Sequence, residues 1–177
     1  MNDFSSLLEE LRSGGYVLYA RHAEATVGED QPNLNYYDCS TQRNLSKTGR
    51  EQAIAYGKVF RSLAIPVEHP VYTSPFCRTR ETTALAFGEG NYFVSPFWAS
   101  VFQVGNHQQQ QMMLYSLNSI FEQQPQPGTN RVIIAHSFPE GFALGFIPNM
   151  GTVVIRPLGQ GNGFEVVDQL TLEDWTN

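Results

Sequence analysis

Two arginines and two histidines follow apolar stretches that are typical of buried strands. Arg21 and His22 come directly after one such stretch, Arg78 lies just beyond a second, and His136 ends the most apolar one. Arginine binds phosphoryl oxygens through paired hydrogen bonds, and a neutral imidazole can attack phosphorus. A second histidine can donate to the phosphoryl oxygens as charge builds up in the transition state. These residue types therefore predict a phosphate site.

Each of these residues also has an ordinary structural interpretation. An Arg-His pair after a strand is usually solvated surface, Arg78 fits the surface of a helix, and His136 fits a hydrogen-bonded core histidine. Their joint position favours the functional interpretation. The carboxyl ends of parallel strands meet at one edge of a sheet, so three strand ends would bring the four side chains together.

The elements that must position these side chains alternate between strand and helix along the chain. Short apolar or β-branched runs predict strands over residues 16–20, 70–74, 92–94, 131–135, 152–155 and 164–167. Helical spacing of apolar residues predicts helices over residues 3–13, 46–63, 75–87, 107–123 and 140–146. The alternation predicts a single α/β domain over residues 1–177, with a mostly parallel central sheet flanked by helices in a three-layer sandwich.

Composition excludes several classes of protein. The net charge of −6 over 177 residues argues against broad nucleic-acid binding, which needs a basic face. Cys39 and Cys77 lie far apart in the sequence and lack metal-ligand spacing, so we expect two reduced thiols and no metal site. Neither a signal-peptide pattern nor an apolar run of membrane-spanning length is visible. We therefore expect a cytoplasmic protein without a membrane partner.

Four motifs in this order resemble those of the histidine phosphatase superfamily, the phosphoglycerate mutase-like proteins. They are Tyr19-Ala20-Arg21-His22-Ala23-Glu24, then Asn44-Leu45-Ser46 with Gly49 and Gln52-Ala53, then Thr73 to Thr82 around Arg78, and Ile134-Ala135-His136-Ser137. The segment from Asp38 to Leu45 is similar to a bacterial subgroup of small phosphatase-type members. The motifs span most of the chain, from about residue 15 to residue 137.

The resemblance implies a mechanism as well as a phosphoglycerate mutase-like fold. His22 would be the nucleophile that is phosphorylated on a ring nitrogen, with Nε2 favoured. Arg21 and Arg78 would bind the phosphoryl oxygens, and His136 would stabilise the group in transfer. The family mechanism requires neither a metal nor another cofactor. The expected substrate is a phosphate monoester or phosphoramidate, carried by a small molecule or a phosphoprotein.

The sequence departs from the family pattern at the proton donor. Residues 97–102 contain no acid where the mutase-like branch has a Glu, and Ser137 stands where the acid-phosphatase branch has an Asp. Glu140 is the first candidate for the donor, and Asp38 and Glu24 are weaker ones; Glu140 could equally be a first-turn helix charge. A phosphohistidine protein phosphatase, a phosphomutase and a degenerate phosphoryl-binding module therefore stay open as alternatives.

Overall fold

A six-stranded sheet lies at the centre of the computed structural model, which describes residues 3–177 without the side chains of residues 102 and 103. Its strands run in the order β3-β2-β4-β1-β5-β6. They are β1 (Val17–Arg21), β2 (Val71–Thr73), β3 (Tyr92–Val94), β4 (Arg131–Ala135), β5 (Thr152–Pro157) and β6 (Phe164–Leu170). The first four strands pair in parallel, whereas β5 and β6 join the sheet antiparallel, so the sheet is mixed and mostly parallel.

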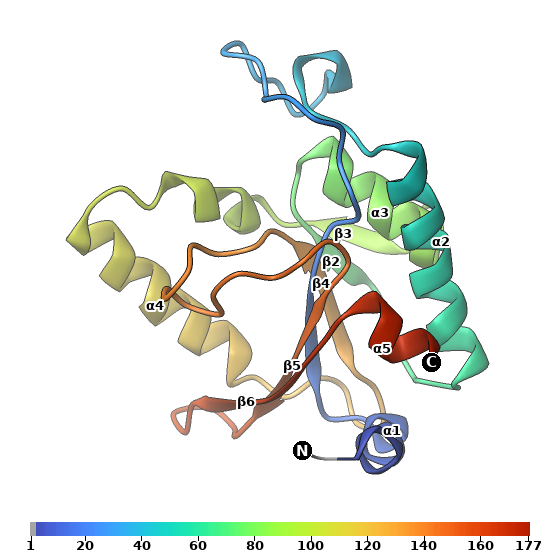
Figure 1. Cartoon of the computed structure of the whole chain (residues 1–177). Helices are drawn as coiled ribbons and strands as arrows, with labels where there is room; N and C mark the ends of the chain where they lie inside the picture. Colours follow the sequence, from blue (N-terminus) through green and yellow to red (C-terminus); the bar gives the residue numbers. More distant parts are fainter. Residues whose placement is uncertain (1–2) are drawn as a thin grey trace.

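Helices cover both faces of this sheet (Figure 1). One face carries α1 (Phe4–Ser13), α2 (Lys47–Ser62), α3 (Cys77–Phe87) and α5 (Leu172–Thr176); the other carries η2 (Pro96–Gln103) and α4 (His107–Phe121). Side chains alternate along β1, so that Leu18 and Ala20 join the first core while Val17 and Tyr19 join the second. The predicted three-layer α/β architecture is confirmed. Among the helices of residues 3–177, none combines the length and the apolar character that a membrane crossing requires.

The segment after β4 differs from the prediction. Residues 140–146 form two turns instead of a helix, closed by hydrogen bonds from Phe142 N–H to the Pro139 carbonyl and from Gly145 N–H to the Phe142 carbonyl. The φ angles of Gly141, Ala143 and Gly145 are 76°, 52° and 73°. Positive φ values are incompatible with a right-handed helix, so the chain turns at these residues.

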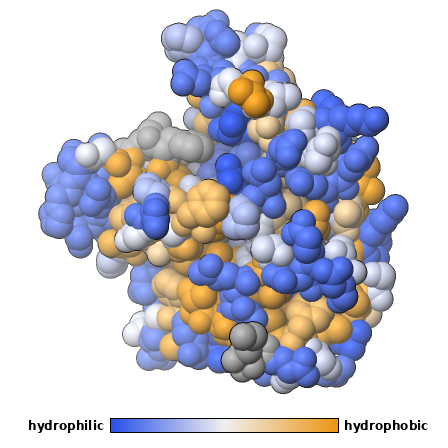
Figure 2. Space-filling model, in the orientation of Figure 1, coloured by the Kyte–Doolittle hydropathy of each residue, from blue (hydrophilic) through white to orange (hydrophobic). Residues whose placement is uncertain are grey.

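The long polar stretch after β1 forms a lobe, residues 26–44, that stands out from the body of the protein (Figure 1). An antiparallel bridge between Ala25 and Leu45 closes its neck, and Thr26 N–H donates to the Asn44 carbonyl there. The lobe contains the short helix η1 (Cys39–Thr41). Its surface is mostly hydrophilic (Figure 2).

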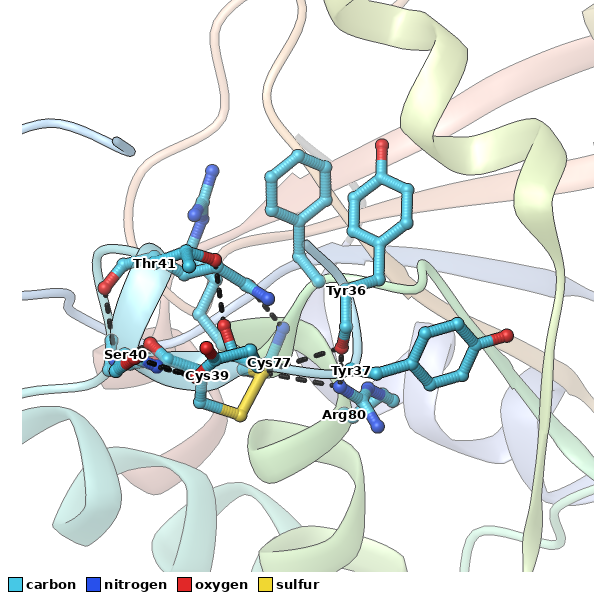
Figure 3. Close-up of a disulfide and its surroundings, with 12 residues drawn as sticks. Tyr36, Tyr37, Cys39, Ser40, Thr41, Cys77 and Arg80 are labelled. Carbon is cyan, nitrogen blue, oxygen red and sulfur yellow. Dashed lines mark hydrogen bonds between the residues drawn. A yellow bond between two sulfur atoms is a disulfide. The ribbon is translucent and has the colours of Figure 1, made fainter. Parts of the chain in front are cut away.

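A disulfide between Cys39 and Cys77 fastens the lobe to the start of α3, with the two Cα atoms 5.8 Å apart (Figure 3). The prediction of two reduced thiols is therefore wrong. It relied on the sequence separation of 38 residues, whereas the fold returns the lobe to the first turn of α3. Disulfides persist in oxidising compartments, so this bond weighs against the expected cytoplasmic location.

Candidate active site

His22 follows β1 and is held by backbone hydrogen bonds on both sides. Its N–H donates to the Ala135 carbonyl at 3.0 Å, and its carbonyl accepts from Met150 N–H at 3.2 Å. The first turn of α2 lies so close to Glu24 that only a glycine fits at Gly49. These contacts bury His22 at the C-terminal edge of the parallel strands, where the sequence predicted a site.

The hydrogen bond of the His22 ring determines its tautomer. Nδ1 lies 2.7 Å from the Ala23 carbonyl oxygen, which can only accept, so Nδ1 carries the proton and Nε2 carries a lone pair. Burial lowers the pKa of His22 to about 3; the hydrogen bond to Ala23 opposes this shift, and the charges of Arg78 and Arg21 add to it. At neutral pH the ring is therefore uncharged, as a nucleophile must be.

His136 follows β4 and faces His22. The two ring centroids are 5.6 Å apart and the ring planes are inclined by 68°. Nε2 of His136 lies 2.8 Å from the Ser74 hydroxyl at the end of β2, and the Tyr19 hydroxyl donates to the His136 carbonyl at 2.8 Å. Burial first, and then the proximity of His22, hold the pKa of His136 well below its ordinary value. The site thus contains two neutral imidazoles.

Arg78 enters the same site from the first turn of α3. Its side chain is only 3% exposed, and its guanidinium lies 4.4 Å from the centre of the Phe76 ring. Thr82, one turn further along α3, donates its hydroxyl to the Arg78 carbonyl at 2.7 Å and accepts from Ala23 N–H at 3.2 Å. Helix α3 is thereby fixed to the residue that follows His22.

Arg21 approaches from the end of β1. It is half-buried, and it donates to the Ile147 carbonyl at 3.1 Å while its guanidinium lies 5.8 Å from the Phe146 ring centre. Burial lowers the pKa of Arg21, and the nearby positive charges of Arg43 and Arg78 lower it further. The structure therefore brings Arg21, Arg78 and the two histidines into one cationic, largely buried cluster.

The lobe supplies two further charged residues to this cluster, Asp30 and Arg43, and neither was predicted as a site residue from the sequence. Asp30 accepts two hydrogen bonds from the Arg78 guanidinium, and the charge of Arg43 acts on His22 and on His136. Arg43 lies within the Asp38–Leu45 segment that resembles the bacterial subgroup, so a signal for it existed. Asp30 stands in a polar stretch without a recognisable motif, and only the folded chain reveals its partner.

The three predicted acids lie in different surroundings. Glu140 is exposed in the turn after β4. Glu24 accepts from the hydroxyl of Ser46, the N-cap of α2, at 2.8 Å, and Asp38 caps η1 by accepting from Ser40 N–H at 3.1 Å. Glu24 and Asp38 thus already stabilise local structure. Within the described part of the chain, no group of three or more His, Cys, Asp or Glu side chains could hold a metal ion.

Comparison with known proteins agrees with this geometry. Residues 17–94 match the family described as Histidine phosphatase superfamily (branch 1). This match covers β1, α2 and α3, and so includes Arg21, His22 and Arg78. No curated protein matches the chain. The resemblance of the sequence to the histidine phosphatase superfamily is confirmed.

Solved structures with the same fold cover nearly the whole chain. An α-ribazole phosphatase from Shigella flexneri superposes with a TM-score of 0.57 at 12% identity, over 89% of this chain and 96% of that one. The protein histidine phosphatase SixA, complexed with tungstate, superposes with a TM-score of 0.53 at 15% identity, over 90% of this chain and 98% of that one. A phosphoserine phosphatase mutant from Entamoeba histolytica, bound to phosphoserine, superposes with a TM-score of 0.53 at 11% identity, over 90% of this chain and 98% of that one. At these identities the likeness shows the fold alone, which is phosphoglycerate mutase-like.

Proposed function

We propose that this protein is a phosphatase that hydrolyses a phosphate monoester or a phosphoramidate through a phosphohistidine on His22. The observation that carries the proposal is the state of His22: a buried, uncharged imidazole with its lone pair on Nε2, beside His136 and among arginines. A nucleophile of this kind needs no base to activate it. The family match over residues 17–94 supports the same reaction class.

In the first step, His22 Nε2 attacks phosphorus and forms an N–P bond while the bond from phosphorus to the leaving group breaks. The leaving oxygen or nitrogen takes up a proton. Arg21 and Arg78 would bind the phosphoryl oxygens, because guanidinium groups match their geometry and charge. His136, oriented by Ser74, would donate a hydrogen bond to the phosphoryl group as charge accumulates on it.

In the second step, water attacks the phosphohistidine. An O–P bond forms, the N–P bond breaks, and one proton of the water returns to the acid that protonated the leaving group. Inorganic phosphate leaves, and the lone pair on Nε2 is restored. Division of the reaction through a covalent intermediate replaces one difficult displacement by two easier ones. Neither half-reaction as written uses a metal or another cofactor.

The substrate class depends on the proton donor. The leaving group of a sugar or serine phosphate is a basic alkoxide, which needs an acid, whereas a phosphohistidine or an acyl phosphate needs little protonation. Glu140 is the proposed donor, since Glu24 and Asp38 are engaged in local structure. If Glu140 does not donate, a phosphohistidine on a protein partner becomes the favoured substrate, as the name of the SixA relative suggests. A phosphomutase and a phosphoryl-binding module without turnover are the remaining alternatives.

The test is turnover of an aryl phosphate without added metal, together with the intact mass of the protein during turnover. The wild type should release phosphate and carry an acid-labile phosphoryl adduct. His22→Ala should lose both the turnover and the adduct. His107→Ala, which removes an exposed histidine on α4, is the matched control and should behave as the wild type.

A folded wild type with neither turnover nor adduct on aryl phosphate and on phosphohistidine would overturn the proposal in favour of the binding module. Turnover that survives in His22→Ala would overturn the assignment of the nucleophile. Product mixtures in which the phosphoryl group moves to a second hydroxyl instead of to water would indicate a mutase.

A further inference from the structure

The lobe contacts Arg78 through a carboxylate. Arg78 Nη1 donates to Asp30 Oδ1 at 2.9 Å and Nη2 donates to Asp30 Oδ2 at 3.3 Å, so each terminal nitrogen of the guanidinium bonds to one oxygen of the carboxylate. This arrangement fixes the plane of the guanidinium as well as its position. Nη1 also donates to the Arg43 carbonyl, at 3.3 Å.

Asp30 is itself held in place. Its Oδ1 accepts from the backbone N–H of Arg43 at 2.9 Å. Burial alone would raise the pKa of Asp30, but the hydrogen bonds from Arg43 and Arg78 and their positive charges outweigh it and lower the pKa below its ordinary value. The group is therefore a carboxylate at neutral pH, and it balances part of the charge of the arginine cluster.

The two sides of the lobe near its neck thus meet at Arg78. Residue 30 lies in the segment that leads into the lobe and residue 43 in the segment that leads out of it, and both contact the same guanidinium. Other bonds hold the lobe there: Cys77 forms the disulfide with Cys39, and Cys77 N–H donates to Gln42 Oε1 at 2.8 Å. Arg80 donates to the Tyr36 carbonyl (Figure 3). The first turn of α3 therefore docks the lobe through three of its side chains, at positions 77, 78 and 80.

We propose that Asp30 is a positioning residue: it holds the Arg78 guanidinium in the orientation that binds a phosphoryl group. The inference rests on the proposed function, because it assumes that Arg78 binds phosphate. Arginine side chains lose considerable rotamer freedom when they bind a ligand. A guanidinium already fixed by a carboxylate has lost that freedom before the substrate arrives, so more of the interaction with phosphate appears as affinity.

Two other roles for Asp30 give different results and serve as outcomes of the test. As a proton donor, Asp30 would matter only for basic leaving groups. As an internal competitor for Arg78, it would weaken phosphate binding, and its removal would tighten it. A positioning residue affects phosphate affinity, and it affects every leaving group alike.

The experiment compares Asp30→Asn with the wild type, with Asp30→Glu as the rescue variant and Glu29→Gln as the matched control. Glu29 is the adjacent carboxylate and is exposed. Binding of inorganic phosphate is measured by calorimetry on the full chain, and kcat and KM are measured for a nitrophenyl phosphate and an alkyl phosphate. Thermal unfolding of each variant verifies that it is folded.

We expect Asp30→Asn to weaken phosphate binding about tenfold and to lower kcat/KM for both substrates by a similar factor. Asp30→Glu should recover part of the affinity, and Glu29→Gln should not change it. A loss confined to the alkyl phosphate, tighter phosphate binding, or unchanged binding in a folded variant would each overturn the proposal. Because phosphate binding needs no turnover, a wild type that binds phosphate but hydrolyses nothing would refute the phosphatase and leave this inference testable.

Discussion

Cys39 in the lobe is bonded to Cys77, the residue immediately before Arg78 in α3, with 5.8 Å between their Cα atoms. The lobe that carries Asp30 and Arg43 is therefore covalently fixed one residue away from a guanidinium of the candidate site. That arrangement predicts that the redox state of this cysteine pair affects phosphate binding at the candidate site.

Reduction of the disulfide should lower both stability and phosphate affinity. The bond closes a loop with a sequence separation of 38 residues, for which the loss of unfolded-state entropy corresponds to about 4 kcal/mol. Thermal unfolding and calorimetry with and without a dithiol reductant measure the two effects. The Cys39→Ser/Cys77→Ser double variant should resemble the reduced protein, and added reductant should not change its melting temperature or its phosphate affinity. Equal melting temperatures of all forms would contradict the prediction.

Ser74→Ala should lower kcat while KM stays nearly unchanged. The Ser74 hydroxyl is the partner of His136 Nε2 at 2.8 Å, and without it the imidazole loses its orientation toward the transferring group. A lost hydrogen bond of this kind corresponds to about a tenfold decrease in rate. Steady-state kinetics with an aryl phosphate measure the effects on kcat and on KM separately, and nitrogen NMR of the histidine rings reports the tautomer of His136. A rise in KM without a fall in kcat would assign Ser74 to substrate binding instead.

The stability of the protein should fall between pH 7.5 and pH 5 because its two buried histidines do not accept protons in the folded state. An unfolded histidine binds a proton near pH 6.5, whereas burial lowers the pKa of His22 to about 3 in the fold. The unfolded state therefore binds more protons in this window, so the free energy of unfolding decreases as pH falls. His22 alone accounts for about 2 kcal/mol between pH 7.5 and pH 5.

Urea unfolding at the two pH values measures this effect. His22→Asn should show a weaker pH dependence than the wild type, whereas His107→Asn, at an exposed position, should keep the full dependence. Identical pH profiles for His22→Asn and the wild type would mean that His22 takes up a proton as readily in the folded protein as in the unfolded chain, which would contradict the lowered pKa of His22.

Glu140→Gln should reduce hydrolysis of an alkyl phosphate about a hundredfold and hardly change that of a nitrophenyl phosphate. The reason is that only the alkoxide leaving group needs the proton. Glu173→Gln, an exposed carboxylate in the first turn of α5, is the control and should affect neither substrate. Equal rates for Glu140→Gln and the wild type on the alkyl phosphate would assign the donor to another group.

The sequence by itself determined the elements with strong local signals. The apolar stretches that form β1 and β4 each end in the polar residues of the site, and the helix predicted from residue 46 is present as α2, with Ser46 accepting from Gly49 N–H as its N-cap. Because the carboxyl ends of parallel strands lie at one edge of a sheet, the sequence predicted that His22 and His136 lie close together, and the pairing of β1 with β4 in the fold places their rings 5.6 Å apart. The motif pattern added a resemblance to the histidine phosphatase superfamily, and residues 17–94 match that family.

Only the tertiary structure decided the features that depend on contacts between distant segments. The Cys39–Cys77 bond and the Asp30–Arg78 pair exist because the lobe folds back onto α3, and no local pattern encodes that return. The turns near Glu140 arise from positive φ angles at positions that include Ala143, a residue with high helix propensity. Local propensity and periodicity act over a few residues, whereas the approach of a loop to a helix is set by the packing of the whole chain.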